Sequence, residues 1–299
     1  MTGVSIQAQS VLFHTELAGI ETAMESLNRS IEIARHDGRV SEATVEFGDC
    51  SPTPMLDDEV LGRWRETYSS VDRLGYEFFG ENLGSARAHN RLADKSTSEL
   101  ILTTNPDVVP APRALEQLIG VFADDLVGIA EAKQVPIEHP KDFDKRSGAT
   151  SWCATAFSLI SRSVFDKVGG FDAETFFLYC DDVDFSWRVR LRGYSAVFQP
   201  AAVVFHDKRV SLDGKWLPTS AERYFSAEAG LLLPYKWSRE DLVDRILTEF
   251  EASDDEVLQR AARTFTGRRD KELLPAQLDY ENKIAEFTDG YYASHRFAL

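Results

Sequence analysis

Apolar residues recur along the first hundred positions in short runs that alternate with segments of helical spacing. The strand-like runs lie at residues 4–13, 43–47, 76–79 and 99–104. The segments with apolar residues three or four positions apart lie at 14–27, 59–74 and 85–95. Such alternation predicts an α/β fold, in which a mostly parallel sheet carries helices on both faces.

The pattern changes after residue 150. In order, it predicts a strand-like run at 151–161, a short helix at 164–168, a turn at 169–172, a helix at 181–192 and a strand at 194–205 that Pro200 interrupts. From Lys236 onward the chain is polar and acidic, with helical spacing at 239–250 and 254–265. We therefore expect a sheet domain over 1–235 and a helical C-terminal extension over 236–299.

Composition and charge narrow the function classes. The chain has 43% hydrophobic and 27% charged residues, as soluble globular proteins have, and a net charge of −16 that disfavours nucleic acid as a partner. The longest apolar runs are too short for a transmembrane segment, and residues 1–30 lack the features of a secretion signal. Three widely spaced cysteines indicate a reducing compartment. We expect a cytoplasmic protein; peripheral attachment to the inner face of the membrane stays open.

Two polar residues at strand ends are candidates for a metal site. In open α/β sheets, ligands bind outside the carboxyl ends of the strands. Asp107 follows the buried strand at 99–104 in a turn that Pro106 stiffens, a position that suits a hard cation bridging phosphates. His206 closes the strand at 194–205 and offers an imidazole ligand. The alternatives are a turn or helix cap for Asp107 and a structural role for His206.

Three carboxylates lie at the start of the predicted helix 181–192: Asp181, Asp182 and Asp184. The positive end of a helix dipole favours ionised carboxylates, which can then accept a proton at neutral pH. The aromatic residues just before the helix, Phe176, Phe177 and Tyr179, could form the wall of a pocket. Helix capping by first-turn acids is the alternative.

A glycine-containing segment at 80–90 includes the turn before the predicted helix 85–95 and the first residues of that helix. Gly80 and Gly84 permit close approach of the backbone to a ligand. The spacing is not that of a dinucleotide-binding fingerprint, and the sequence has no Gly-Lys-Ser/Thr phosphate loop. A plain connection is the alternative.

These signals, in this order, resemble the family 2 glycosyltransferases of the GT-A fold, and within them the bacterial rhamnosyltransferase-like branch. The resemblance covers roughly residues 5–235. Its motifs are Gly169-Gly170-Phe171-Asp172, Asp182-Val183-Asp184 with Arg188 and Gly193-Tyr194, Asn82-Leu83-Gly84 with Asn90, Asn105-Pro106-Asp107, and His206.

The resemblance implies an inverting transfer from a dTDP- or UDP-sugar to an acceptor hydroxyl. It implies that Asp182 is the general base, supported by Asp181, and that Asp107 and His206 hold Mn²⁺ or Mg²⁺ on the diphosphate. The donor-binding residues that it implies are Asp49, Asn82, Gly84, Asn90, Asn105 and Trp152. A core position is the alternative for Trp152. The acceptor class stays open between a glycan, a lipid-linked molecule and a small molecule, and a homodimer through the C-terminal helices is open too.

Three departures from the family pattern stand out. Phe47-Gly48-Asp49-Cys50-Ser51 replaces Val-Asp-Asn-x-Ser, which displaces the base-binding acid by one residue. Asp181 stands where Glu is more common, and Asn105 replaces the first Asp of the metal motif. Asn105 keeps one alternative function open, a non-catalytic nucleotide-sugar-binding protein. The other alternative is a nucleotidyltransferase, another enzyme class built on a similar sheet. The glycine-rich basic signature expected of the latter near the first strand is absent.

Overall fold

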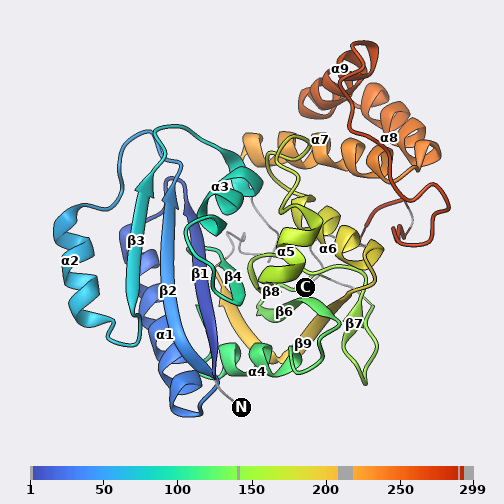
Figure 1. Ribbon diagram of the computed structural model, residues 1–299. Coiled ribbons are helices and arrows are strands. Elements are labelled where there is room, and N and C mark those ends of the chain that lie inside the picture. The colour runs from blue at the N-terminus through green and yellow to red at the C-terminus, as the bar shows by residue number, and fades with distance from the viewer. Residues whose placement is uncertain (1–2, 140–141, 208–217, 289, 293–299) are drawn as a thin grey trace.

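The computed structural model describes residues 3–139, 142–207, 218–288 and 290–292 (Figure 1). In chain order the elements are β1 (Val4–Leu12), α1 (Leu17–His36), β2 (Val40–Asp49), α2 (Asp58–Thr67), β3 (Arg73–Phe78), α3 (Gly84–Ala93), β4 (Leu100–Thr104), β5 (Val108–Pro110), α4 (Ala114–Val121), β6 (Val127–Val135), β7 (Ala149–Thr150), β8 (Phe157–Ser161), α5 (Arg162–Val168), α6 (Asp181–Leu191), β9 (Ser195–His206), α7 (Ser220–Lys236), α8 (Glu240–Ala252) and α9 (Glu256–Asp270).

Within the described residues, nine strands form one mixed sheet in the order β3-β2-β1-β4-β8-β6-β9-β5, with β7 paired to β9. Strands β1 to β4 are mutually parallel. Strand β8 is antiparallel to both β4 and β6, and β9 is parallel to β6. The carboxyl ends of β1, β2, β3, β4, β6 and β9 therefore meet at one edge of the sheet. We call this edge the carboxyl edge.

Helices cover both faces of the sheet, as the sequence predicted (Figure 1). The two faces have separate hydrophobic cores because alternate strand residues point to opposite sides. Leu100 and Leu102 of β4 lie in one core with residues of α1 and α4. Ile101, between them, lies in the other core with residues of α3, α5 and α6. The expected α/β class is confirmed.

The C-terminal helices α7, α8 and α9 pack on one another beside the sheet, at the upper right of Figure 1. Their core also contains Trp152, Phe176 and Trp187 from the preceding part of the chain. Trp187 of α6 meets Trp237, the residue after α7, edge to face at 5.3 Å between ring centroids. The predicted boundary at 235/236 falls at the end of α7, and the division into two domains stays a prediction.

Several element bounds differ from those predicted. The helix predicted at 59–74 ends at Thr67, because residues 73–78 pair with β2 as strand β3. The strand predicted at 151–161 is confirmed only over 157–161. Strand β6 and helix α7 were not predicted. Pro200 does not end β9; the strand continues past it through a register shift.

Candidate active site

Asp107 and His206 face each other at the carboxyl edge. Strand β5 pairs antiparallel with β9 so that Val108 lies opposite His206, and the Asp207 amide donates to the Asp107 carbonyl at 3.0 Å. Nε2 of His206 lies 3.3 Å from Oδ1 of Asp107 and 3.5 Å from Nδ2 of Asn105. His206 is buried and the Asp107 side chain is half exposed. The three residues that the sequence places at two strand ends thus form one cluster.

The tautomer of His206 suits a metal ligand. Nδ1 lies 2.7 Å from Oε1 of Gln134, an acceptor, so Nδ1 carries the proton and Nε2 keeps its lone pair. Nε2 and the Asp107 carboxylate oxygen, 3.3 Å apart, lie close enough to be ligands of one cation. One imidazole and one carboxylate fit Mn²⁺ or Mg²⁺ that takes its other ligands from phosphates and water. No group of three or more His, Cys, Asp or Glu side chains that could hold a metal occurs in the part of the chain that the structure describes.

The predicted catalytic carboxylates lie at the start of α6. The two residues before it, Tyr179 and Cys180, have left-handed φ values of 69° and 59°, a conformation that costs energy for side chains other than glycine. Asp181 is 4% exposed, and its Oδ2 has no hydrogen-bond partner among the described residues. Asp182 is half-buried and accepts from the Val183 amide at 2.8 Å. The neighbouring carboxylates therefore have different environments.

Those environments determine where the pair holds a proton. Burial raises the pKa of Asp181 to about 7; the negative charge of Asp182 adds to the rise, and a hydrogen bond from Ser85 opposes it. A pKa of about 7 means that Asp181 is protonated below neutral pH and partly ionised at pH 7.

The start of α3 touches the segment before α6. The Ser85 amide donates to the Phe177 carbonyl at 3.0 Å, and Gly84 has a φ of +73°. A Cβ on Gly84 would lie 2.2 Å from that carbonyl oxygen, so only glycine fits. The exposed Asn82 accepts from the Gly84 amide at 3.1 Å and fixes the turn. Since α3 follows β3, this contact places the start of α6 at the carboxyl edge.

Three predicted donor-binding residues serve the protein's own structure. Both amide atoms of Asn90 bond the Phe171 backbone at 2.8 Å. Asp49 is fully buried and accepts from Ser51, Met55 and the Tyr76 hydroxyl. Trp152 is 2% exposed and lies in the C-terminal core, which favours a core role. The geometry adds no support for direct donor contacts by these three residues.

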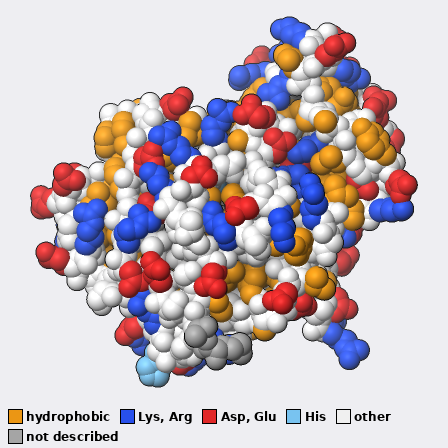
Figure 2. All heavy atoms as spheres, in the orientation of Figure 1, with side chains coloured by type: hydrophobic (Ala, Val, Ile, Leu, Met, Phe, Trp, Pro, Cys, Tyr) orange, Lys and Arg blue, Asp and Glu red, His pale blue; other side chains and the backbone are white. Residues whose placement is uncertain are grey.

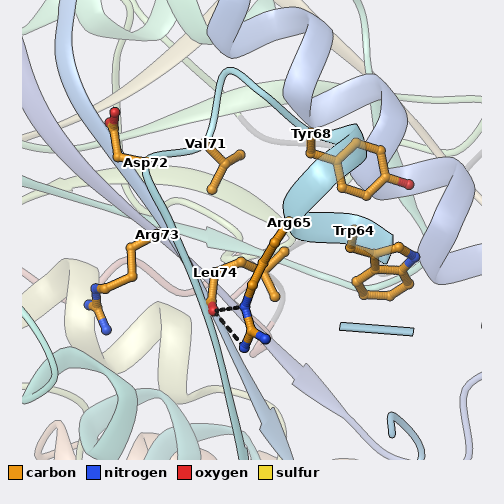
Figure 3. Close-up of a pocket in the computed structure, with 7 residues that line it drawn as sticks. All are labelled: Trp64, Arg65, Tyr68, Val71, Asp72, Arg73 and Leu74. Atoms are coloured by element: carbon orange, nitrogen blue, oxygen red, sulfur yellow. Dashed lines mark hydrogen bonds between the residues drawn. The ribbon is translucent and has the colours of Figure 1, made fainter. Parts of the chain in front are cut away.

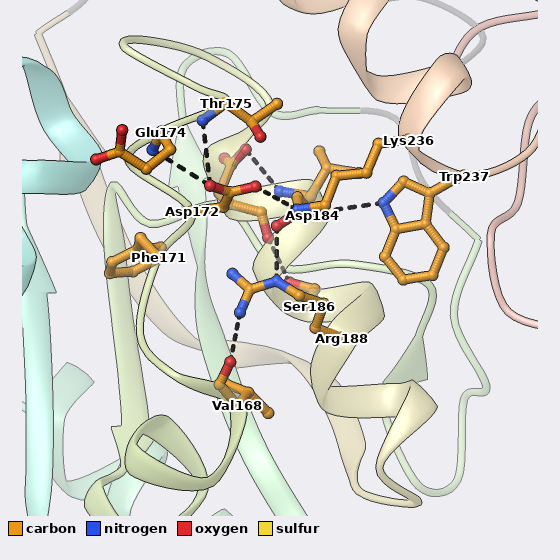
Figure 4. A network of polar contacts seen from close by, with 12 residues as sticks. Val168, Phe171, Asp172, Glu174, Thr175, Asp184, Ser186, Arg188, Lys236 and Trp237 are labelled. Carbon is orange, nitrogen blue, oxygen red and sulfur yellow. Dashed lines mark hydrogen bonds and ion pairs between the residues drawn. The ribbon is translucent and has the colours of Figure 1, made fainter. Parts of the chain in front are cut away.

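A buried ion network, which sequence reasoning did not detect, joins α6 to the C-terminal helices (Figure 4). Lys236 Nζ lies 2.6 Å from Oδ2 of Asp172 and 2.7 Å from Oδ1 of Asp184. Asp184 also pairs with Arg188 at 2.7 Å and accepts from the Trp237 indole at 3.1 Å. Two carboxylates and two cations balance, so the network is neutral. It fixes the first turn of α6, which carries the candidate base.

Solved structures with the same architecture identify the fold. The mannosyltransferase PcManGT from Pyrobaculum calidifontis, in complex with GDP-Man and Mn²⁺, superposes with a TM-score of 0.57 at 17% identity over 90% of this chain and 76% of that one. GalNAc-T7 with UDP, GalNAc and Mn²⁺ superposes with a TM-score of 0.65 at 12% identity over 94% of this chain and 56% of that one. The fold is that of the GT-A glycosyltransferases.

Curated relatives agree with this fold. The rhamnosyltransferase WbbL of Escherichia coli is 33% identical over 93 residues, which are 29% of this chain and 35% of WbbL. The pre-mycofactocin glycosyltransferase of Mycobacterium tuberculosis is 29% identical over 187 residues, 56% of this chain and 38% of that protein. The matched segments span less than two fifths of either relative. No protein-family model matches the chain.

One cavity of this GT-A protein lies away from the carboxyl edge. It has a volume of about 220 Å³ and is lined by residues 64–65, 68 and 71–74, between the end of α2 and the start of β3 (Figure 3). Arg65 donates to the Leu74 carbonyl from Nε at 3.4 Å and from a terminal nitrogen at 3.3 Å. The start of β3 is at the opposite edge from the candidate site, so the cavity belongs to a different part of the molecule.

The surface of this GT-A protein mixes charges of both signs. On the face drawn in Figure 2, acidic and basic side chains are interspersed, over the C-terminal helices as well as over the sheet domain. Each helix among the described residues is too short or too polar to cross a bilayer.

Proposed function

We propose that this protein is an inverting, metal-dependent glycosyltransferase that moves a sugar from a dTDP- or UDP-sugar to an acceptor hydroxyl, with Asp182 as general base. The observation that carries the proposal is the pair of Asp107 and His206, whose Oδ1 and Nε2 face each other at 3.3 Å on the carboxyl edge of a GT-A fold. Metal ligands at the strand ends are what a diphosphate leaving group requires.

His206 and Asp107 would hold the metal, with the Asn105 amide beside them. When bound, Mn²⁺ neutralises the negative charge that develops on the departing diphosphate. We favour Mn²⁺ over Mg²⁺ because an imidazole nitrogen suits transition metals better than Mg²⁺. Two structural neighbours are described with Mn²⁺ and a nucleotide or nucleotide sugar, which supports this choice.

The carboxylates at the start of α6 divide the acid–base roles. Burial and the charge of Asp182 raise the pKa of Asp181 to about 7, so Asp181 is protonated below neutral pH and only partly ionised at pH 7. Asp182 is the more accessible carboxylate and lies at the positive end of the helix dipole. A carboxylate in this position can accept a proton from a hydroxyl group. This division favours Asp182 over Asp181 as the base.

The reaction then proceeds by a single displacement. The acceptor oxygen forms a bond to the anomeric carbon while its proton passes to Asp182. The bond from that carbon to the diphosphate oxygen breaks with both electrons, and the nucleoside diphosphate leaves. Attack from the face opposite the leaving group inverts the anomeric configuration. Asp182 also stabilises positive charge on the sugar ring in the oxocarbenium-like transition state.

The loops at the carboxyl edge would shape the donor pocket. The bonds of Asp49 to Ser51, Met55 and Tyr76 fix the loop after β2, and Asn82 and Gly84 fix the loop after β3. We assign Asp49 to the shape of the base pocket rather than to readout of the base. The acceptor class stays open; a relative from Mycobacterium tuberculosis, 42% identical over 57 residues, is an N-acetylglucosaminyl-diphospho-decaprenol L-rhamnosyltransferase.

A nucleotide-release assay tests the function. Wild-type protein, a panel of dTDP- and UDP-sugars and Mn²⁺ are incubated with and without acceptors, and released nucleoside diphosphate is measured. We expect turnover with one donor class and a loss of about 10²–10⁴-fold in Asp182→Asn, the usual contribution of a positioned base. The conservative Asp125→Asn variant, in the turn before β6, serves as the control.

Donor binding separates the alternatives. If wild type and Asp182→Asn both bind nucleotide sugar, seen as a shift of the melting temperature, but neither releases nucleotide with any donor, the protein is a non-catalytic nucleotide-sugar binder. Release of pyrophosphate from a nucleoside triphosphate and a sugar phosphate would indicate a nucleotidyltransferase. Either result contradicts the proposal.

A further inference from the structure

Gln134 is a buried amide that none of the sequence motifs includes. It lies near the carboxyl end of β6, is 2% exposed, and places Oε1 2.7 Å from Nδ1 of His206. Its backbone amide donates to Oε2 of Glu138 at 2.7 Å, which fixes the end of the strand. The Gln134 side chain faces the imidazole of the candidate metal ligand.

A register shift between β6 and β9 brings the two side chains to the same face of the sheet. Ala132 pairs with Gln199, but the next residue, Lys133, pairs with Val203, so β9 carries three extra residues at this point. The first of them is Pro200, which has no amide hydrogen and cannot donate to the ladder. Beyond the shift, Gln134 pairs with Val204, two residues before His206.

Because the number of inserted residues is odd, the insertion changes the face of the sheet to which the later residues of β9 point. Aligned residues of parallel strands point to the same face, and residues two apart on a strand share a face. Gln134, Val204 and His206 therefore lie on one face. Without the three extra residues Gln134 would pair with Ala201, and His206 would point to the opposite face. The bulge at Pro200 is what lets Gln134 reach the ring.

We infer that Gln134 is a positioning residue that sets the tautomer and ring orientation of His206, so that the Nε2 lone pair points toward Asp107 and would be available to the metal. This inference rests on the proposed metal role of that pair. An acceptor on the distal nitrogen of a metal-ligating histidine fixes the tautomer and raises the basicity of the ligand, and its loss lowers metal affinity by about 10–100-fold. Gln134 supplies that acceptor without adding charge.

The tautomer can be measured without metal or turnover. Protein labelled with ¹⁵N-histidine is studied by two-bond ¹H–¹⁵N correlation at pH 8, and His206 is assigned with His206→Gln. We expect the proton of wild-type His206 on Nδ1, and at least partial transfer to Nε2 in Gln134→Leu, which has no acceptor. Wild-type protein with its proton on Nε2 would overturn the inference.

Metal affinity gives the second measurement. Free Mn²⁺ is measured by electron paramagnetic resonance in the presence of UDP or dTDP, whichever raises the melting temperature of the wild type. We expect Gln134→Leu to bind Mn²⁺ about 10–100-fold more weakly, and Gln134→Glu, which keeps an acceptor, to bind at least as tightly as the wild type. Unchanged affinity in folded Gln134→Leu refutes the inference. If Gln134→Leu does not fold, the Mn²⁺ affinity of Gln134→Glu and the tautomer of the wild type still test whether Gln134 positions His206.

The molecule offers a matched control. Gln9 is another buried glutamine whose side chain lies 3.1 Å from Nδ1 of a histidine, His89, in the core under α3. Gln9→Leu removes a buried glutamine–histidine bond in which the amide nitrogen donates to the ring, and it should leave Mn²⁺ affinity unchanged. Asp107→Ala separates the two proposals. If it binds Mn²⁺ as well as the wild type, the proposed metal site fails, while the tautomer measurement still tests Gln134.

Discussion

Replacing Lys236 with methionine tests the ion network that joins α7 to α6. Lys236 is 5% exposed and lies between Asp172 and Asp184, with Nζ 2.6 and 2.7 Å from their oxygens. Methionine has a similar length and no charge. After the substitution Asp184 keeps its pair with Arg188 and its bond from Trp237, whereas Asp172 loses its only cation among the described contacts.

The structure sets the size of the effect. Removing one partner of a buried ion pair costs about 3–5 kcal/mol, because the remaining charge stays buried and uncompensated. The Asp172 side chain is 23% exposed and keeps its hydrogen bonds from the Glu174 and Thr175 amides, which favours the lower end of that range. A loss of about 3 kcal/mol lowers the melting temperature by roughly 5 °C in a chain of 299 residues.

The effect should depend on pH. Burial raises the pKa of Asp172, but the charge and hydrogen bond of Lys236, with hydrogen bonds from Thr175, outweigh burial and leave the pKa below its ordinary value of 3.8. A depressed carboxyl pKa stabilises the fold above the ordinary pKa, and that stabilisation is lost as the pH falls through the folded-state value. The difference between wild type and Lys236→Met should therefore be full at pH 7 and shrink below about pH 4.

Chemical denaturation of a double-mutant cycle is the assay. Wild type, Lys236→Met, Asp172→Asn and the double variant are unfolded in urea at pH 7. Because Asp172→Asn removes the charge that Lys236→Met leaves unpaired, we expect the double variant to be about 1–3 kcal/mol more stable than additivity predicts. Lys283→Met, at an exposed pair with Glu281, is the control and should change little. Additive losses in the cycle would refute the argument.

Three further predictions follow from single contacts. Asp181→Asn should be more stable than the wild type at pH 8. The pKa of Asp181, raised to about 7, makes the free energy of unfolding of the wild type fall as the pH rises from about 4 to 7. Equal curves of stability against pH for the two proteins would contradict this prediction. Gly84→Ala should lower the free energy of unfolding in urea by well over 1 kcal/mol, because the φ of +73° at Gly84 and the nearby Phe177 carbonyl exclude a Cβ. Gly19→Ala is the control and should cause no such loss, because a Cβ at Gly19 would lie in open space. EDTA should abolish sugar transfer and Asp107→Ala should weaken donor binding by calorimetry; full activity in EDTA would disprove the assigned metal ligands.

The alternation of strands and helices was predictable because it depends on local periodicity. The error at 59–74 shows the limit of that signal. Leu61, Trp64, Tyr68, Val71 and Leu74 keep a helical spacing throughout, yet the helix ends at Thr67 and Leu74 pairs with Val45 in the sheet. Tertiary pairing overrides local spacing there. Strand β6 was missed because Glu131, a charged residue, is fully buried in its middle.

The candidate site was predictable to the extent that it lies at strand ends. Asn105, Asp107 and His206 each end or follow a strand, and parallel topology brings such positions to one edge. Contacts that depend on register were not predictable. Gln134 meets His206 only because β9 holds three extra residues at Pro200, and composition does not specify where a strand bulges. Asn90, by contrast, is a recognisable motif residue whose amide turns out to hold the Phe171 backbone.

The contacts of Lys236 and Trp237 change the meaning of the predicted boundary at 235/236. In chain order these two residues open the C-terminal extension, but both bond Asp184, two positions after the proposed base. Asp184 is fully buried, so the first turn of α6 cannot shift without breaking charged contacts to α7 and Trp237. The helical extension therefore helps to determine where Asp182 lies, although none of its described residues carries the motifs by which the sequence resembles its family.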